Sequence, residues 1–206
     1  ISQRARQLME VAVVKYNAGN VFSVINALSR LGVKAVLTDD AEVIQNASHV
    51  VFPGQGEAAG AMKCLRDTGL DKVILGLRQP VLGICIGQQL MCRHSEEGDV
   101  DCLGIFDTDV KRFVVNPDDN RWKIPHMGWN TVTDLGGFMD LGHSEEWMYF
   151  IHSYYVPLSE WTVGATSYCD IKFSAAMQKD NFMSAQFHPE KSGDAGYRLL
   201  QHFLKL

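Results

Sequence analysis

The sequence predicts one α/β domain with an open, mostly parallel sheet that is flanked by helices and gains antiparallel strands in its C-terminal half. Two observations lead to this prediction. In the first half, short apolar runs alternate with segments of helical periodicity, which is typical of a parallel sheet with helices on both faces. In the second half, strand-like segments follow one another with few helices between them, which favours antiparallel pairing.

The first half of the chain is divided into elements by its apolar runs and its turn residues. Runs of the buried-strand type predict strands at residues 11–14, 33–37, 49–52 and 81–84. Apolar residues at helical spacing predict helices at residues 21–31, 58–65, 70–78 and 86–94. Gly32 follows the first of these helices, as expected for a helix C-terminus.

The second half is expected to hold strands at residues 147–156, 163–168, 173–178 and 182–186, and a final helix at 193–204. The length of 206 residues suits a single domain, which we expect to span residues 10–206. Residues 1–9 carry two arginines but lack the apolar centre of a secretory signal, so we expect them to be a leader or an added segment.

Composition excludes several classes of function. The net charge is −5, so the chain has no excess of basic residues to attract nucleic acid or an anionic membrane. No apolar run approaches the roughly 20 residues that span a bilayer. Five cysteines without a C-x-x-C pair argue against a disulfide framework and a zinc ribbon, and predict a reducing, cytoplasmic location. We expect neither a metal nor another cofactor, because no His, Cys, Asp or Glu cluster has ligand spacing.

Cys85 is the first candidate for chemistry, because an apolar strand ends there in the pattern G-x-C-x-G and a helix begins at once. This arrangement is a nucleophile elbow with cysteine in place of serine. The field of a helix N-terminus favours the thiolate, and the backbone N–H of Ile86 is free to stabilise an oxyanion. The competing interpretation is that Cys85 is a small buried core residue, the usual situation of a free cysteine.

His188 is the candidate base. It follows an expected strand, and Pro189 stiffens the turn after it. Glu190 lies two residues further on, where its carboxylate can accept a hydrogen bond from the imidazole and stabilise the imidazolium. A His-Pro-Glu sequence alone is a weak signal, but together with the elbow about a hundred residues upstream it indicates nucleophilic catalysis.

These motifs resemble those of the class I (triad) glutamine amidotransferases. The matching segments are Pro53-Gly54-x-Gly56, Gly83-Ile84-Cys85-Ile86-Gly87-Gln88-Gln89 and His188-Pro189-Glu190, in that order. The resemblance implies that fold and a triad of Cys85, His188 and Glu190. It also implies an oxyanion strand at Gly54, Gln55 and Gly56, and glutamine-binding positions at Gln89, Glu97, Ser153 and Tyr154. Gln55 and Gln88 depart from the family, which more often has Val and Met there.

One branch of the family is most similar, the glutaminase subunits of imidazole glycerol phosphate synthases. The segments that carry this resemblance are Lys15–Asn20, Lys123–Asn130, Phe150–Tyr155 and Lys191-Ser192. The resemblance implies hydrolysis of L-glutamine and transfer of ammonia to a (β/α)8-barrel cyclase in a heterodimer of histidine biosynthesis. It further implies a partner interface at His126, Met127, Trp129, Asn130 and Lys191. From the residues alone, an exposed loop at 125–130 that faces a partner and one that simply packs a turn are equally favoured.

Two other functions remain open at this point. The chain could serve another synthase, of the anthranilate or pyridoxal phosphate type, with the same triad and a different acceptor. It could also be a redox sensor or chaperone in which Cys85 is oxidised and not acylated. The Pro-His-Met-Gly-Trp-Asn segment at 125–130 argues against the first alternative, and the His-Pro-Glu motif argues against the second.

Overall fold

Alternate side chains of the first strand, Glu10–Val14 (β1), divide the interior of the protein into two halves. Val11 and Val13 pack in one apolar cluster, whereas Ala12 and Val14 pack in another. This alternation is what a strand that is covered on both faces must show, because successive side chains point to opposite sides of a sheet. The core therefore consists of two apolar layers, one on each face of the central sheet.

The central sheet has seven strands in the order β11-β12-β13-β4-β3-β1-β2 in the computed structural model, which describes residues 9–17, 19–54 and 56–206. The strands are β1, β2 (Lys34–Thr38), β3 (His49–Phe52), β4 (Val81–Ile84), β11 (Thr162–Tyr168), β12 (Ile171–Lys179) and β13 (Phe182–Ala185). The five strands from β13 to β2 are parallel, and β12 and β11 extend them in antiparallel fashion. The predicted fold class is confirmed.

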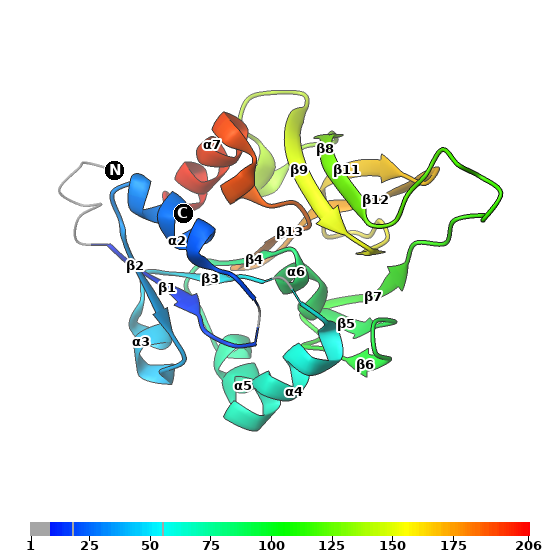
Figure 1. Cartoon of the computed structure of the whole chain (residues 1–206). Helices are drawn as coiled ribbons and strands as arrows, with labels where there is room; N and C mark the ends of the chain where they lie inside the picture. The colour runs from blue at the N-terminus through cyan, green and yellow to red at the C-terminus, as the bar shows by residue number, and fades with distance from the viewer. Residues whose placement is uncertain (1–8, 18, 55) are drawn as a thin grey trace.

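Helices cover both faces of this sheet (Figure 1). α2 (Phe22–Arg30) and α7 (Gly193–Phe203) supply Leu28 and Leu199 to one apolar layer. The other layer receives side chains from α3 (Ala41–Asn46), α4 (Ala58–Thr68), α5 (Leu70–Leu75) and α6 (Ile86–Leu90). Two 3-10 turns, η1 (Gly137–Met139) and η2 (Pro189–Lys191), complete the helical elements of the described residues.

Two smaller sheets stand beside the central one. A four-stranded sheet has the order β10-β7-β5-β6, and a hairpin-like pair joins β8 to β9. Their bounds are β5 (Cys92–Ser95), β6 (Val100–Asp101), β7 (Phe106–Arg112), β8 (His126–Val132), β9 (Glu146–His152) and β10 (Tyr154–Tyr155). Among the described helices, none is long and apolar enough to cross a bilayer.

The structure corrects several expected elements. The helix expected at 86–94 ends at Leu90, because Cys92–Ser95 pairs with β7 as a strand. The helix expected at 70–78 ends at Leu75, where Gly76 follows. The strand expected at 147–156 is interrupted at Ser153. The loop expected at 125–130 is wrong, since His126–Val132 pairs with β9 in an antiparallel ladder.

Predictions about the chain's limits remain open. Residues 1–8 of the expected leader lie outside the described residues, so the structure does not test it. The domain boundary at residue 10 also stays a prediction. So does the cytoplasmic location, which no feature of the structure tests.

Candidate active site

The turn between β4 and α6 places Cys85 in a strained backbone conformation. Its φ of 55° and ψ of −108° lie in a region of backbone conformation that residues with a Cβ rarely adopt. Two glycines make the turn possible: a Cβ on Gly83 would lie 2.9 Å from the backbone carbon of Gly87. The Cys85 N–H donates to Ala185 O at 2.8 Å, which ties the turn to the end of β13. The structure thus has the elbow geometry that the sequence predicts.

The Cys85 thiol is buried, with 7% of the residue exposed, and has two polar neighbours. It donates to the backbone carbonyl of Ile151 on β9, with Sγ and O 3.7 Å apart. The side-chain amide of Gln186 donates to Sγ from 3.8 Å. A sulfur that receives an N–H hydrogen bond is better able to carry negative charge.

His188 and Glu190 meet at the end of β13, where η2 begins. The imidazole Nδ1 and the Glu190 carboxylate Oε1 are 2.6 Å apart, and both side chains are almost fully buried. With Nδ1–H donated to Glu190, the other nitrogen, Nε2, is left for the nucleophile or a substrate proton. Within the described part of the chain, this buried Nε2 has no hydrogen-bond partner. The structure therefore pairs two residues of the predicted triad, with the base oriented by Glu190. The influence of Cys85 on the pKa of His188 indicates that the third residue lies near the imidazole.

Strand β9 contacts both catalytic candidates through alternate carbonyls. The His188 N–H donates to Tyr149 O at 2.9 Å, and Cys85 donates to Ile151 O two residues further on. The register of the β8–β9 ladder places Trp129 opposite Tyr149 and Met127 opposite Ile151. The exposed side chains of β8 are thus one strand away from the nucleophile and the base.

The charge of His188 depends on its two acidic neighbours. Burial, the largest influence, lowers the pKa of His188, but interactions with the nearby Cys85 and then with Glu190 outweigh it and raise the pKa to about 10. The imidazolium is therefore the favoured form in the folded protein at neutral pH, paired with the two acidic groups.

This raised pKa predicts a loss of stability at alkaline pH. The folded protein holds the His188 proton more tightly than the unfolded chain, whose pKa is about 6.5. The stabilisation is fully present below about pH 6.5 and is lost as the pH rises toward about 10. Urea unfolding of the wild type and of His188→Gln across this range should show that the difference in unfolding free energy shrinks with pH. A difference that stays constant would contradict the assigned pKa.

The segment predicted to be the oxyanion strand lies beside the elbow, since Gly56 lines the same pocket as Cys85 and Ile86. Gly54 and Gly56 have φ values of 155° and 153°, which favour glycine. As the first residue of α6, Ile86 has an N–H without an intrahelical acceptor. Gln55, the third predicted member of this strand, lies outside the described residues. Gln88 points away from the pocket, because its side-chain amide bonds to Ser174 O and Ser184 Oγ in the core.

A pocket of about 300 Å³ opens above the Cys85 sulfur. The four residues predicted to bind substrate all line it: Gln89, Glu97, Ser153 and Tyr154. The other lining residues are Gly56, Cys85, Ile86, Pro125, Ile151 and His152. Burial raises the pKa of the Glu97 carboxyl, and the Ala58 N–H that donates to it at 2.8 Å acts in the opposite direction. A pocket with a nucleophile, a carboxylate and amide groups suits a small polar substrate.

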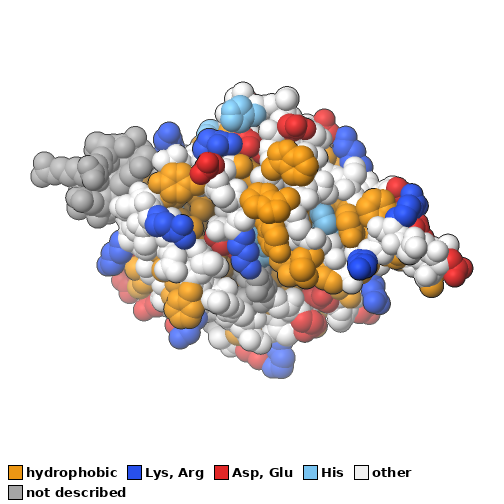
Figure 2. Space-filling view, turned by 45° about the horizontal axis from the view of Figure 1, so that its top comes forward, with side chains coloured by type: hydrophobic (Ala, Val, Ile, Leu, Met, Phe, Trp, Pro, Cys, Tyr) orange, Lys and Arg blue, Asp and Glu red, His pale blue; other side chains and the backbone are white. Residues whose placement is uncertain are grey.

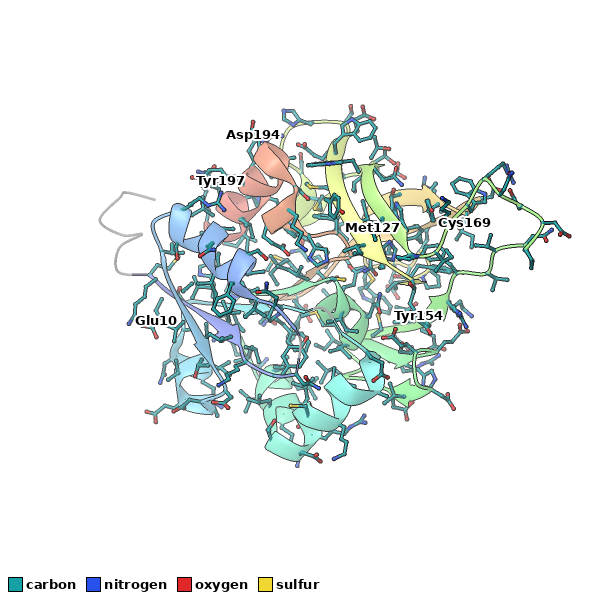
Figure 3. The ribbon with its side chains drawn as sticks, in the orientation of Figure 1. Glu10, Met127, Tyr154, Cys169, Asp194 and Tyr197 are labelled. Atoms are coloured by element: carbon teal, nitrogen blue, oxygen red, sulfur yellow. The ribbon has the colours of Figure 1, made fainter. Side chains whose placement is uncertain are left out.

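The predicted interface residues divide between the surface and the interior. Met127 and Trp129 are more than half exposed, as is Trp147 on the paired strand. Figure 2 shows hydrophobic side chains gathered over this part of the molecule, and Figure 3 labels Met127 on β8. Lys191 is exposed and Asn130 is partly so. His126 is only 4% exposed, so the expectation that it faces a partner from a surface loop is wrong.

Sequence reasoning missed three residues near the sulfur. Gln186 donates to it, and His152 lines the pocket with a pKa that burial lowers to about 3. The Tyr16 hydroxyl donates to Pro53 O at the start of the oxyanion strand. Gln186 stands two residues before His188, but no spacing in the sequence indicates its contact with Cys85. Within residues 9–17, 19–54 and 56–206, no group of His, Cys, Asp and Glu is placed to hold a metal ion.

Comparisons with known sequences agree with this geometry. Residues 12–206 match the family model described as glutamine amidotransferase class-I. A relative from Bacteroides fragilis, named imidazole glycerol phosphate synthase subunit HisH, is 59% identical over 199 residues, which cover 96% of this chain and 100% of the relative. A protein of the same name from Idiomarina loihiensis is 42% identical, with 96% and 98% of the two chains covered.

Solved structures with low sequence identity share the fold. One described as a glutamine amidotransferase has a TM-score of 0.71 at 20% identity and covers 95% of this chain and 97% of its own. PurLQS from Thermotoga maritima has a TM-score of 0.65 at 14% identity, with 96% and 98% covered.

Proposed function

The chain belongs to the class I glutamine amidotransferases, and from this premise we propose that Cys85, His188 and Glu190 are the triad with which it hydrolyses glutamine. The observation that supports the proposal most directly is the pocket, in which Cys85 lies together with Gln89, Glu97 and the Ser153–Tyr154 segment. The hydrogen bond between His188 and Glu190 supports it as well.

The activity follows from membership of this family. The chain is a glutamine amidotransferase and acts as the glutaminase subunit of an imidazole glycerol phosphate synthase, since a relative of that name is 59% identical over its entire length. It is accordingly a subunit of a complex. Family membership excludes the redox-sensor and chaperone interpretation, and the similarity to HisH subunits disfavours a synthase of the anthranilate or pyridoxal phosphate type.

Acylation of Cys85 is the first half of the proposed reaction. The thiolate attacks the side-chain amide carbon of glutamine, and a C–S bond forms. The oxyanion accepts hydrogen bonds from the Ile86 N–H and from an N–H of the Gly54–Gly56 segment. His188 passes its Nε2 proton to the nitrogen as the C–N bond breaks, and ammonia leaves. A γ-glutamyl thioester remains on Cys85.

Hydrolysis of the thioester completes the cycle. A water molecule attacks the thioester carbon while the now neutral His188 accepts its proton. The C–S bond breaks, glutamate is released and the imidazolium–thiolate pair is restored. Glu190 holds the imidazole orientation throughout and stabilises its charged form.

The partner is the second part of the proposal. The ammonia would pass to a (β/α)8-barrel cyclase subunit that contacts the exposed face of β8 at Met127 and Trp129. Asn130 on the other face of the same strand and the exposed Lys191 are the further predicted contacts. The exposure of Met127 and Trp129 supports this, because methionine and aromatic side chains are enriched at protein interfaces. β8 pairs with β9, and the carbonyls of β9 bond to His188 and Cys85. A partner bound to β8 could therefore influence the position of both residues.

Release of glutamate from glutamine tests this proposal. We expect low activity of the chain alone and at least about tenfold stimulation by the cyclase with a ligand in its active site, within the usual range of coupling between sites. An anthranilate synthase large subunit serves as the matched control and should not stimulate. If the control stimulates glutamate release and the cyclase does not, the chain serves another synthase. If neither protein elicits glutamate release, the proposed triad is rejected.

A further inference from the structure

A chain of buried hydrogen bonds connects the nucleophile with the partner-facing strand β8. From Cys85 it runs through the side chains of Gln186 and Gln89 to the backbone carbonyl of Tyr154. From the same carbonyl it continues through His152 and His126 to Asn130 on β8. Tyr154, labelled in Figure 3, therefore joins two arms of one network.

The orientation of the first arm follows from one unambiguous acceptor. A backbone carbonyl can only accept, so the Gln89 atom 3.1 Å from Tyr154 O is the amide nitrogen Nε2. Its second hydrogen is donated to an atom of Gln186 at 3.0 Å, which is consequently Oε1. The other end of the Gln186 amide, the Nε2 donor, is thereby turned to the Cys85 sulfur. Gln186 is fully buried, so no solvent competes for these bonds.

The second arm is oriented by the same carbonyl. The Nδ1 of His152 lies 2.7 Å from Tyr154 O and must carry a hydrogen, so in the neutral ring Nε2 is an acceptor. His126 donates to it from Nδ1 at 2.9 Å and accepts from Asn130 at 3.3 Å through Nε2. Burial lowers the pKa of His126 to about 4 and that of His152 to about 3, which keeps both rings neutral.

We propose that Gln186 is a positioning residue for the nucleophile, whose side-chain amide holds the Cys85 sulfur and stabilises its thiolate. Its orientation is set by Gln89 and the carbonyl of Tyr154, to which the arm from Asn130 also donates. The network is not a proton path, because both arms donate to Tyr154 O and the first arm consists of amide groups. Its contribution is electrostatic and geometric. The inference rests on the proposed role of Cys85 as the nucleophile.

Gln186→Met tests this inference, because methionine has a similar length and no N–H donor. The readout is the rate of Cys85 alkylation by iodoacetamide as a function of pH, located by mass spectrometry in the complex with the cyclase. We expect the midpoint of the profile to rise by about one pH unit, and alkylation below it to slow about tenfold, as for one lost hydrogen bond to a charged group. The kcat for glutamine should fall while KM changes little.

Gln88→Met is the matched control. Gln88 is as buried as Gln186, and its side chain bonds to Ser174 and Ser184 on neighbouring strands and not to the Cys85 sulfur. Its backbone N–H donates to Cys85 O, a bond that the substitution leaves in place. This variant should leave the alkylation profile unchanged. Gln186→Glu keeps the shape of the side chain and should raise the midpoint as well, which covers the case that the methionine variant does not fold.

An unchanged profile in both Gln186 variants, or an equal shift in Gln88→Met, would overturn the inference. Alkylation reports the thiol and not the substrate, so it separates this inference from the proposed function. A shifted midpoint in Gln186→Met together with a wild type that does not hydrolyse glutamine would leave the inference in place and reject the function.

Discussion

Replacing Cys85 by alanine is expected to abolish glutamate release by the liganded complex, with a fall in kcat of roughly 10⁵-fold or more, the scale seen when a triad loses its nucleophile. No neighbouring group can substitute for the sulfur, since Gln186 and Ile151 offer only an amide and a carbonyl. Alanine also has a Cβ, so it meets the same positive φ as cysteine and should keep the turn.

The matched control is Cys169→Ser, which changes a free, partly exposed cysteine that also has a positive φ. It should retain the full rate, and only the Cys85 variant should resist labelling by a glutamine-analogue electrophile. Circular dichroism and binding to the cyclase establish that the alanine variant is folded. Residual hydrolysis by Cys85→Ala within tenfold of wild type would reject the triad.

Replacing Gly87 by alanine is expected to lower both the stability of the fold and the rate of glutamine hydrolysis. A Cβ there would lie 2.2 Å from the backbone carbonyl oxygen of Phe52, which cannot move as a flexible side chain can. Overpacking of this kind costs about 1–3 kcal/mol and sometimes more, and we expect the upper part of that range. Phe52 lies two residues before Gly54 of the predicted oxyanion strand, so kcat should fall about 10²-fold or more as that segment shifts.

Gly76→Ala is the control for the second prediction. Its Cβ would lie 3.5 Å from the nearest atom, and its φ of −85° suits alanine. Its unfolding free energy should change by no more than about 1 kcal/mol, with unchanged kcat. Urea unfolding and glutamate release measure the two quantities. A Gly87→Ala protein as stable and as active as Gly76→Ala would mean that the elbow and β3 are not in such close contact.

The elbow and the His-Pro-Glu motif could be predicted from sequence because their geometry is local. A strand, two glycines and a helix within a few residues determine where Cys85 lies, and Pro189 determines the turn that orients His188. Four of the five parallel strands were equally accessible, since each is a short apolar run between turns. The fifth, β13, was expected among the antiparallel additions, but it pairs with β4 in parallel.

The elements that were missed depend on partners far away in the chain. Cys92–Ser95 has the local character of a continuing helix, and only pairing with β7 makes it a strand. The strand at His126–Val132 exists because it pairs with β9, whose nearest residue is 14 positions away, and this pairing buries His126. For the same reason the contact of Gln186 with Cys85, 101 residues apart, could not be derived from spacing.

The hydrogen bond from the His188 N–H to Tyr149 O has a consequence for how long the base stays in place. A backbone amide exchanges its hydrogen with deuterium only while such a bond is open, so protection of this one amide reports the fraction of time for which the base is docked on β9. Trp129 lies opposite Tyr149 on the other side of the same ladder. A partner protein bound to β8 would therefore hold the ladder that carries Tyr149. Deuterium uptake at the His188 amide would then report how such binding changes the time for which the catalytic base stays docked.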